Sequence, residues 1–149
     1  MTSNLKTRQL SLADAQAVQA CYDSQPKLML IEKEGNDFPY ADTFNHLLRS
    51  GCIAFGVYDS EELKAFSVFW PWPHMPAATL VLAVNRPDGA LYNPERSGLQ
   101  AALDAGLAHL ESEGRSSVYF VRSAAKRWKH SVIRNRLGRL GEYHSVAIE

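Results

Sequence analysis

The stretch "CIAFGVYDSEELKAFSVFWPWPHMPAATLVLAV", residues 52–84, contains three runs of the kind that form β-strands. They are rich in β-branched and aromatic residues, and short polar or proline-rich connections separate them. The runs are residues 52–59, 63–72 and 78–84. Because such short connections join antiparallel neighbours, the stretch predicts a three-stranded antiparallel meander.

The second connection, "PWPHMPA" at residues 71–77, contains three prolines. Proline has no N–H for a strand ladder, so the segment is expected to be a loop or a sheet edge. Large side chains gather in and beside it: Phe69, Trp70, Trp72, His74 and Met75. Two interpretations stay open. These side chains line a substrate groove or a protein interface, or two rings cap the core while the others cover an edge.

Apolar residues at helical spacing predict two helices before the meander, over residues 11–24 and 40–51, after a strand over 5–10. Ser11 and Asp14 form a capping-box pattern, and Gly51 is placed to end the second helix. The residues expected to face inward are Leu12, Ala15, Val18 and Tyr22 in the first helix, and Phe44, Leu47 and Leu48 in the second.

After the meander the pattern predicts a further helix over 97–114, with Gly114 as its stop, and a buried strand over 116–122. A basic helix over 125–138 and a last strand over 143–149 follow. The step from strand 78–84 through a helix to strand 116–122 is a crossover, and crossovers join parallel strands. The chain is therefore predicted to be one α/β (α+β) domain, residues 1–149, with a mixed, mainly antiparallel sheet flanked by helices.

The composition excludes several classes of protein. Lys+Arg 16 balance Asp+Glu 16, so no global field favours nucleic acid or a membrane surface. Cys21 and Cys52 have no metal-binding spacing and are expected to be buried, reduced thiols. The five histidines show no metal-ligand spacing either, so no metal is expected. The N-terminus lacks the apolar core of a signal peptide and no stretch could span a bilayer, which favours a cytoplasmic protein.

This order of elements resembles the GCN5-related N-acetyltransferase (GNAT) superfamily over nearly the whole chain. "RQLSLADAQAVQACY" is similar to the family's opening strand and helix, "GVYDSEELKAFSVFW" to its central hairpin, and "LGRLGEYHSVAIE" to its closing strand. The resemblance implies a V-shaped opening where the fourth and fifth strands part. It also implies acetyl-CoA as co-substrate and an amine as acceptor.

In that family, backbone N–H groups at the start of the helix after the fourth strand hold the pyrophosphate of the cofactor. The resemblance gives this role to Arg96, Ser97, Gly98 and Leu99, and the alignment of pantetheine to the backbone of Ala83, Val84 and Asn85. The first N–H groups of any helix lack internal partners and carry the positive end of its dipole, so they suit a phosphate. The alternative is an ordinary helix start capped by Ser97.

The sequence departs from the family's phosphate signature, which is Gln or Arg, two residues, Gly, one residue, then Gly or Ala. With Gly98 at the first glycine, Glu95 and Gln100 occupy the outer two positions. A carboxylate at the first of these positions would repel a pyrophosphate.

The family's general-acid tyrosine also has no counterpart at its usual place, since Arg134 stands there. Tyr119 and Tyr143 are the remaining catalytic candidates, and each has the alternative of being a core or edge aromatic. The loop residues Asp88, Glu95 and His74 are candidates for a general base, and nothing in the sequence selects among them.

Two functions stay open: transfer of an acetyl or similar acyl group from CoA to an amine, or a catalytically inactive GNAT-like module in a larger assembly. The second would suit a small phage-encoded protein. A protein partner would then bind through Trp70, Trp72 and Met75, or through the basic residues 122–139. The basic residues have two further interpretations, a solvated helix face or contacts to the phosphates of CoA. Nucleic acid and membrane are not expected, and an oligomer is compatible with either function.

Overall fold

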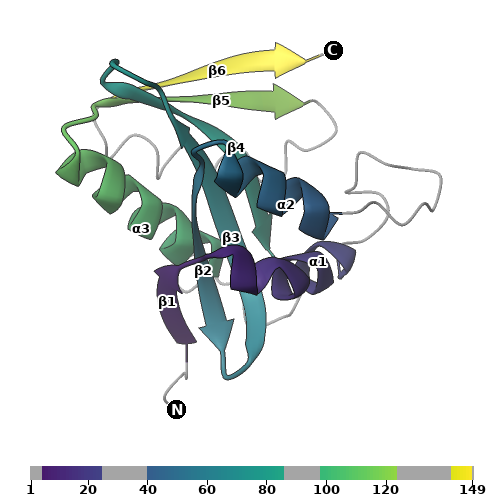
Figure 1. The fold of residues 1–149 in the computed structure, drawn as a ribbon. Helices are drawn as coiled ribbons and strands as arrows, with labels where there is room; N and C mark the ends of the chain where they lie inside the picture. The colour runs from purple at the N-terminus through teal and green to yellow at the C-terminus, as the bar shows by residue number, and fades with distance from the viewer. Residues whose placement is uncertain (1–4, 25–39, 86–97, 124–141, 149) are drawn as a thin grey trace.

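A six-stranded sheet runs through the middle of the molecule (Figure 1). The computed structural model describes residues 5–24, 40–85, 98–123 and 142–148. The strands are β1 (Leu5–Gln9), β2 (Ile53–Asp59), β3 (Glu62–Pro71), β4 (Ala77–Asn85), β5 (Ser117–Ser123) and β6 (Glu142–Ile148). The helices are η1 (Leu12–Asp14), α1 (Ala15–Asp23), α2 (Tyr40–Arg49) and α3 (Gly98–Ser112). The predicted basic helix over 125–138 lies outside the described residues.

The strands are arranged in chain order, β1-β2-β3-β4-β5-β6. The first four strands pair with one another in antiparallel fashion, while β5 is parallel to both β4 and β6. This arrangement confirms the predicted meander and the parallel crossover that follows it. The turn between β2 and β3 is tight, with Ser60 at a left-handed φ of 58°.

Both faces of the sheet are covered (Figure 1). On one face α3 packs through its apolar stripe, including Leu99, Leu103, Leu107 and Leu110, against Phe69 of β3. On the other face α1 and α2 pack against Phe66 and Val68 of the same strand. Because both faces are buried, β3 is apolar along most of its length rather than alternating.

The predicted cap and stop residues of the helices are confirmed, but one residue predicted to face inward does not. Ser11 and Asp14 form a complete capping box, and Gly51 and Gly114 take φ values of 104° and 81° after their helices. The expectation that Leu12 faces inward is wrong, because its side chain is 43% exposed. The first turn is a 3-10 turn, whose three residues per turn rotate Leu12 away from the stripe that α1 buries. Cys21 and Cys52 form no disulfide and are buried, as expected.

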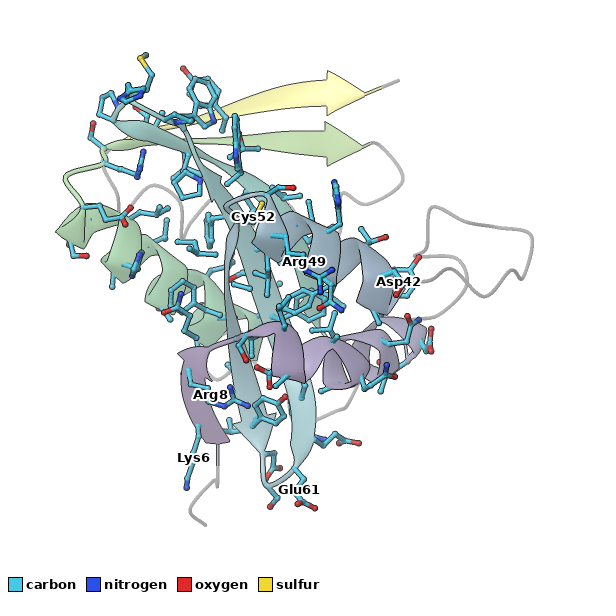
Figure 2. All side chains as sticks on the ribbon, viewed as in Figure 1. Lys6, Arg8, Asp42, Arg49, Cys52 and Glu61 are labelled. Atoms are coloured by element: carbon cyan, nitrogen blue, oxygen red, sulfur yellow. The ribbon has the colours of Figure 1, made fainter. Side chains whose placement is uncertain are left out.

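A buried carboxylate ties the first strand to the sheet and to η1. Asp14 accepts hydrogen bonds from both Arg8 amino groups at 2.6 and 3.1 Å, from the Ser11 backbone N–H at 2.8 Å and from the Tyr58 hydroxyl at 2.7 Å. Arg8 projects from β1 (Figure 2), and its guanidinium also lies 4.6 Å from the centre of the Tyr58 ring. Burial of the Tyr58 hydroxyl and its bond to Asp14 raise the pKa of Tyr58 to about 12.

On the opposite face, α3 approaches β3 closely because one position of the helix is glycine. A Cβ on Gly106 would stand 2.2 Å from Cε1 of the fully buried Phe69. Nearby, the buried Ser67 hydroxyl donates to the carbonyl oxygen of Ala102 at 2.8 Å. The helix is therefore held at a short, defined distance from the strand.

We predict that Asp14 makes the stability of the protein acid-sensitive. Burial raises the pKa of Asp14, but the bonds from Arg8, Ser11 and Tyr58 outweigh burial and hold that pKa below its ordinary value. The carboxylate therefore contributes stability above the unfolded-state pKa of about 3.9, and this is lost as pH falls through the lower folded pKa.

Asp14→Asn is expected to lower the free energy of unfolding by about 1–3 kcal/mol at pH 7, measured by urea denaturation. The difference from the parent protein should shrink below about pH 4. The control Asp23→Asn, at an exposed position of α1, should change stability little at either pH. An unchanged difference between parent and Asp14→Asn down to pH 2 would contradict this role.

Gly106→Ala is expected to destabilise the protein, although alanine favours helices by about 1 kcal/mol over glycine. The added methyl group would force the buried Phe69 ring aside, at a cost of about 1–3 kcal/mol. Denaturant titrations of Gly106→Ala, Phe69→Leu and the double variant should show that the smaller side chain at 69 relieves most of this clash. Strictly additive effects would mean that the two positions are not in contact.

Candidate functional site between the diverging strands

The fourth and fifth strands pair over only part of their length. Residues Ala77–Leu80 of β4 pair with Ser117–Phe120 of β5, whereas β4 continues along β3 as far as Asn85. Beyond this point β5 pairs with β6 alone as far as Ser123. Figure 1 shows β5 and β6 together at the top of the view, while β4 runs down beside β3. The two parallel strands therefore form a V that opens after Leu80.

A β-bulge lies where the V opens. Val68 of β3 pairs with Leu82 and Phe69 pairs with Leu80, so Val81 is an extra residue on β4. The bulge reverses the alternation of side chains, since Leu80 belongs to the α3 core and Leu82 to the core of the other face. A bulge bends its strand and increases its twist. This distortion accounts for β4 leaving β5 at this point.

The start of α3 lies at the open end of the V. The helix connects two parallel strands, so it runs antiparallel to them and its first residue lies near their carboxyl ends. Its first turn carries no acidic side chain, and Gly98 and Leu99 are buried. Ala83 of β4 packs against the same core cluster as Leu99. The open end of the V therefore meets the positive end of a helix dipole.

The structure brings together the described members of the predicted cofactor site. Ala83, Val84 and Asn85 form the part of β4 beyond the bulge, and Gly98 and Leu99 begin α3. Arg96 and Ser97, like Asp88, Glu95 and Arg134, lie outside the described residues.

The two tyrosine candidates are both on the parallel strands. Tyr143 is opposite Val118 in the β5–β6 register, and its side chain lies outside the described part of the structure. Tyr119 is opposite Thr79 on β4, one residue before the last β4–β5 pair. Its ring stacks on Trp72 with centroids 4.7 Å apart and planes at 18°. A catalytic role for either tyrosine stays a prediction.

The loop after β3 is fixed by an arginine that the sequence analysis did not single out. Nη1 of Arg115 donates to the carbonyl oxygens of Trp72 and Met75 at 2.8 Å and of Ala77 at 3.0 Å. The indole N–H of Trp72 donates to the Thr79 hydroxyl at 2.7 Å. An arginine that lies 38 or more residues away from these partners in the chain gives no local signal of this role.

The aromatic stretch before and within this loop divides between core and surface. Phe69 is fully buried, Trp70 is 39% exposed and Met75 is 54% exposed. Phe69 is therefore a core residue, and a groove or interface role for the exposed side chains stays a prediction. In the described ranges no group of three His, Cys, Asp or Glu side chains could hold a metal ion, and no helix is long and apolar enough to cross a bilayer.

No protein-family model and no curated protein sequence matches the chain. Several solved structures match its fold. An acetyltransferase of the GNAT family from Staphylococcus aureus gives a TM-score of 0.68 at 11% identity, over 88% of this chain and 82% of that one. An aminoglycoside acetyltransferase from an uncultured soil metagenomic sample, in complex with sisomicin, gives a TM-score of 0.65 at 13% identity, over 89% of this chain and 87% of that one. The PaiA N-acetyltransferase of Thermoplasma acidophilum, in complex with coenzyme A, gives a TM-score of 0.60 at 16% identity, over 77% of this chain and 76% of that one. The fold is that of the GNAT acetyltransferases, as the sequence resemblance predicted.

We predict that Arg115 orders the Trp72–Tyr119 stack. Arg115→Met removes the three bonds to the loop carbonyls, so the near-ultraviolet circular dichroism of the stacked rings should weaken while the far-ultraviolet signal is kept. The matched control is Glu113→Gln, because Glu113 pairs with Nε of Arg115 and not with the loop. The control should leave the aromatic signal unchanged. Equal loss of signal in both variants would contradict the role of the three bonds from Arg115 in ordering the stack.

Proposed function

We propose that this protein transfers an acetyl or similar acyl group from coenzyme A to an amine, with the thioester bound in the V between β4 and β5. The observation that carries the proposal is the separation of β4 from β5 at the Val81 bulge, with the start of α3 at the same open end. The coenzyme A complex of the Thermoplasma protein, which has the same fold, supports a CoA-type ligand.

The residues present suit such a ligand. Beyond Leu80 the edge of β4 that faces β5 has no ladder partner among the described strands, so the backbone of Ala83, Val84 and Asn85 is available on that side to align an extended pantetheine chain. The pyrophosphate would bind the N–H groups at the start of α3, where Arg96, Ser97, Gly98 and Leu99 follow one another in the sequence.

The reaction needs an amine that has lost its proton. Its nitrogen forms a C–N bond to the acyl carbon and gives up one further proton as the C–S bond breaks, and the leaving thiolate takes up one proton, so that the products are the amide and the thiol. Tyr119 is the stronger of the two candidate proton donors because its position adjoins the last pair before the strands part. The stack on Trp72 would hold its ring in one orientation.

The second candidate function is that of an inactive module in a larger assembly. It is favoured by three departures from the family's pattern. Gln100 occupies the first turn of α3, where the GNAT signature has a small residue. Glu95 precedes the helix, and Arg134 replaces the usual tyrosine. On either proposal we place the protein in the cytoplasm.

Calorimetric titration of acetyl-CoA and CoA into the protein at low salt separates the two functions. We expect dissociation constants in the micromolar range for the enzyme. Absence of binding at millimolar ligand would overturn the enzyme proposal and leave the inactive module.

Gln100→Glu tests the phosphate site with a change that favours folding. A carboxylate in the first turn of a helix stabilises it by about 0.3–1 kcal/mol, yet it would repel a bound pyrophosphate. At roughly 7 Å and an effective dielectric constant of about 40, the repulsion is about 1.2 kcal/mol, so acetyl-CoA should bind roughly tenfold more weakly. The matched control is Gln16→Glu in the first turn of α1, which should leave binding unchanged. Equal affinity in all three proteins would place the phosphates elsewhere.

A further inference from the structure

A row of partly exposed side chains crosses three strands beside the closed end of the V. Trp70 of β3 pairs with Thr79 of β4, and Thr79 pairs with Tyr119 of β5. Directly paired residues point to the same face of a sheet, so the three side chains lie together. Trp72 completes the group by bonding to Thr79 and stacking on Tyr119. We refer to Trp70, Trp72, Thr79 and Tyr119 as the aromatic row.

The aromatic row lies on the face of the sheet that α3 does not cover. The neighbours that alternate with it, Phe69, Ala78 and Val118, are buried in the α3 core. That core covers one side of the vertex, so within the described residues the side of the aromatic row is the one left for a second substrate to approach a thioester held there. Val81 at the bulge, 36% exposed, extends the partly exposed surface from the row toward the opening.

The row is pre-ordered. Arg115 fixes the loop that carries Trp72 through three carbonyl oxygens, and the Trp72 N–H is already bonded to Thr79. Little side-chain freedom remains to be lost when a flat group binds against these rings. Trp70, which is 39% exposed, offers the largest accessible ring of the group.

On this basis, and resting on the proposed acyl transfer, we propose that the aromatic row binds the acceptor and selects an amine attached through a short chain to a planar apolar group. None of its four side chains carries a charge, so the row offers stacking and apolar contact rather than the carboxylates that a polycation needs. The protonated amine is itself attracted to an indole face. The planar group would lie on Trp70 while the amine nitrogen points to the vertex.

The test compares acceptors in an assay that follows release of the CoA thiol from acetyl-CoA. We expect kcat/KM for tryptamine and 2-phenylethylamine to exceed that for spermidine and sisomicin by tenfold or more. If the polycations are preferred, the acceptor inference is overturned while the proposed acyl transfer stands.

Variants separate binding from folding. Trp70→Leu should raise KM for tryptamine about tenfold, with little change in kcat or in the affinity for acetyl-CoA. Met75→Leu is the control, because Met75 is exposed in the loop that follows β3 and lies outside the row. An unchanged KM in Trp70→Leu would overturn the assignment of this residue.

A binding measurement keeps the inference testable if no turnover is found. 2-Phenylethylamine, which has no indole, should change the tryptophan fluorescence of the parent protein and not that of Trp70→Leu, with CoA present or absent. No response in the parent protein would overturn the inference. So would a sedimentation shift from dimer to monomer in Trp70→Leu with unchanged acceptor kinetics, since the row would then be a contact between copies.

Discussion

The candidate binding site between β4 and β5 depends on how β4 pairs with its two neighbours, β3 and β5. It pairs with β3 from Pro71↔Ala78 to Ala65↔Asn85, but with β5 over only four positions. A backbone edge released from its ladder must find other hydrogen-bond partners, because buried N–H and C=O groups left unpaired are costly. The bulge at Val81 thus produces an edge suited to an extended polar chain or to water.

The distortion is tolerated because both faces of β4 are anchored on either side of the bulge. Leu80 belongs to the core under α3, while Leu82 and Val84 belong to or pack against the core under α1 and α2. A slip of one residue would exchange these faces and place each side chain in the core that it does not fit. The close approach of α3 at Gly106, together with the Ser67 bond to Ala102, keeps the helix start beside the diverging strand. Packing far from the opening therefore sets the geometry within it.

Much of the fold could be predicted from local patterns in the sequence. The meander follows from its short connections, the capping box at Ser11 from residue types, and the stops at Gly51 and Gly114 from the glycines that the left-handed conformation favours.

The bulge could not be predicted, because "ATLVLAV" is apolar at nearly every position and so has no alternation whose reversal would reveal an extra residue. Contacts between segments far apart in the sequence could not be predicted either. Arg115 and Tyr119 meet the Trp72 loop only through the pairing of β4 with β5, and no local pattern records that pairing.

The two departures from the GNAT phosphate signature differ in kind: Glu95 adds a negative charge, whereas Gln100 is neutral but larger than the Gly or Ala of the signature. The opening is built from backbone: a bulged strand, a parallel strand that leaves it and the first turn of a helix. Each backbone N–H that donates to an anion contributes about 1.5–3 kcal/mol, whereas one carboxylate about 7 Å away costs about 1 kcal/mol at an effective dielectric constant of about 40. On these magnitudes the carboxylate of Glu95 would weaken a phosphate site without abolishing it. The substitutions alone are therefore a poor argument for lost function, since they leave unchanged the register of β4 on which the opening depends.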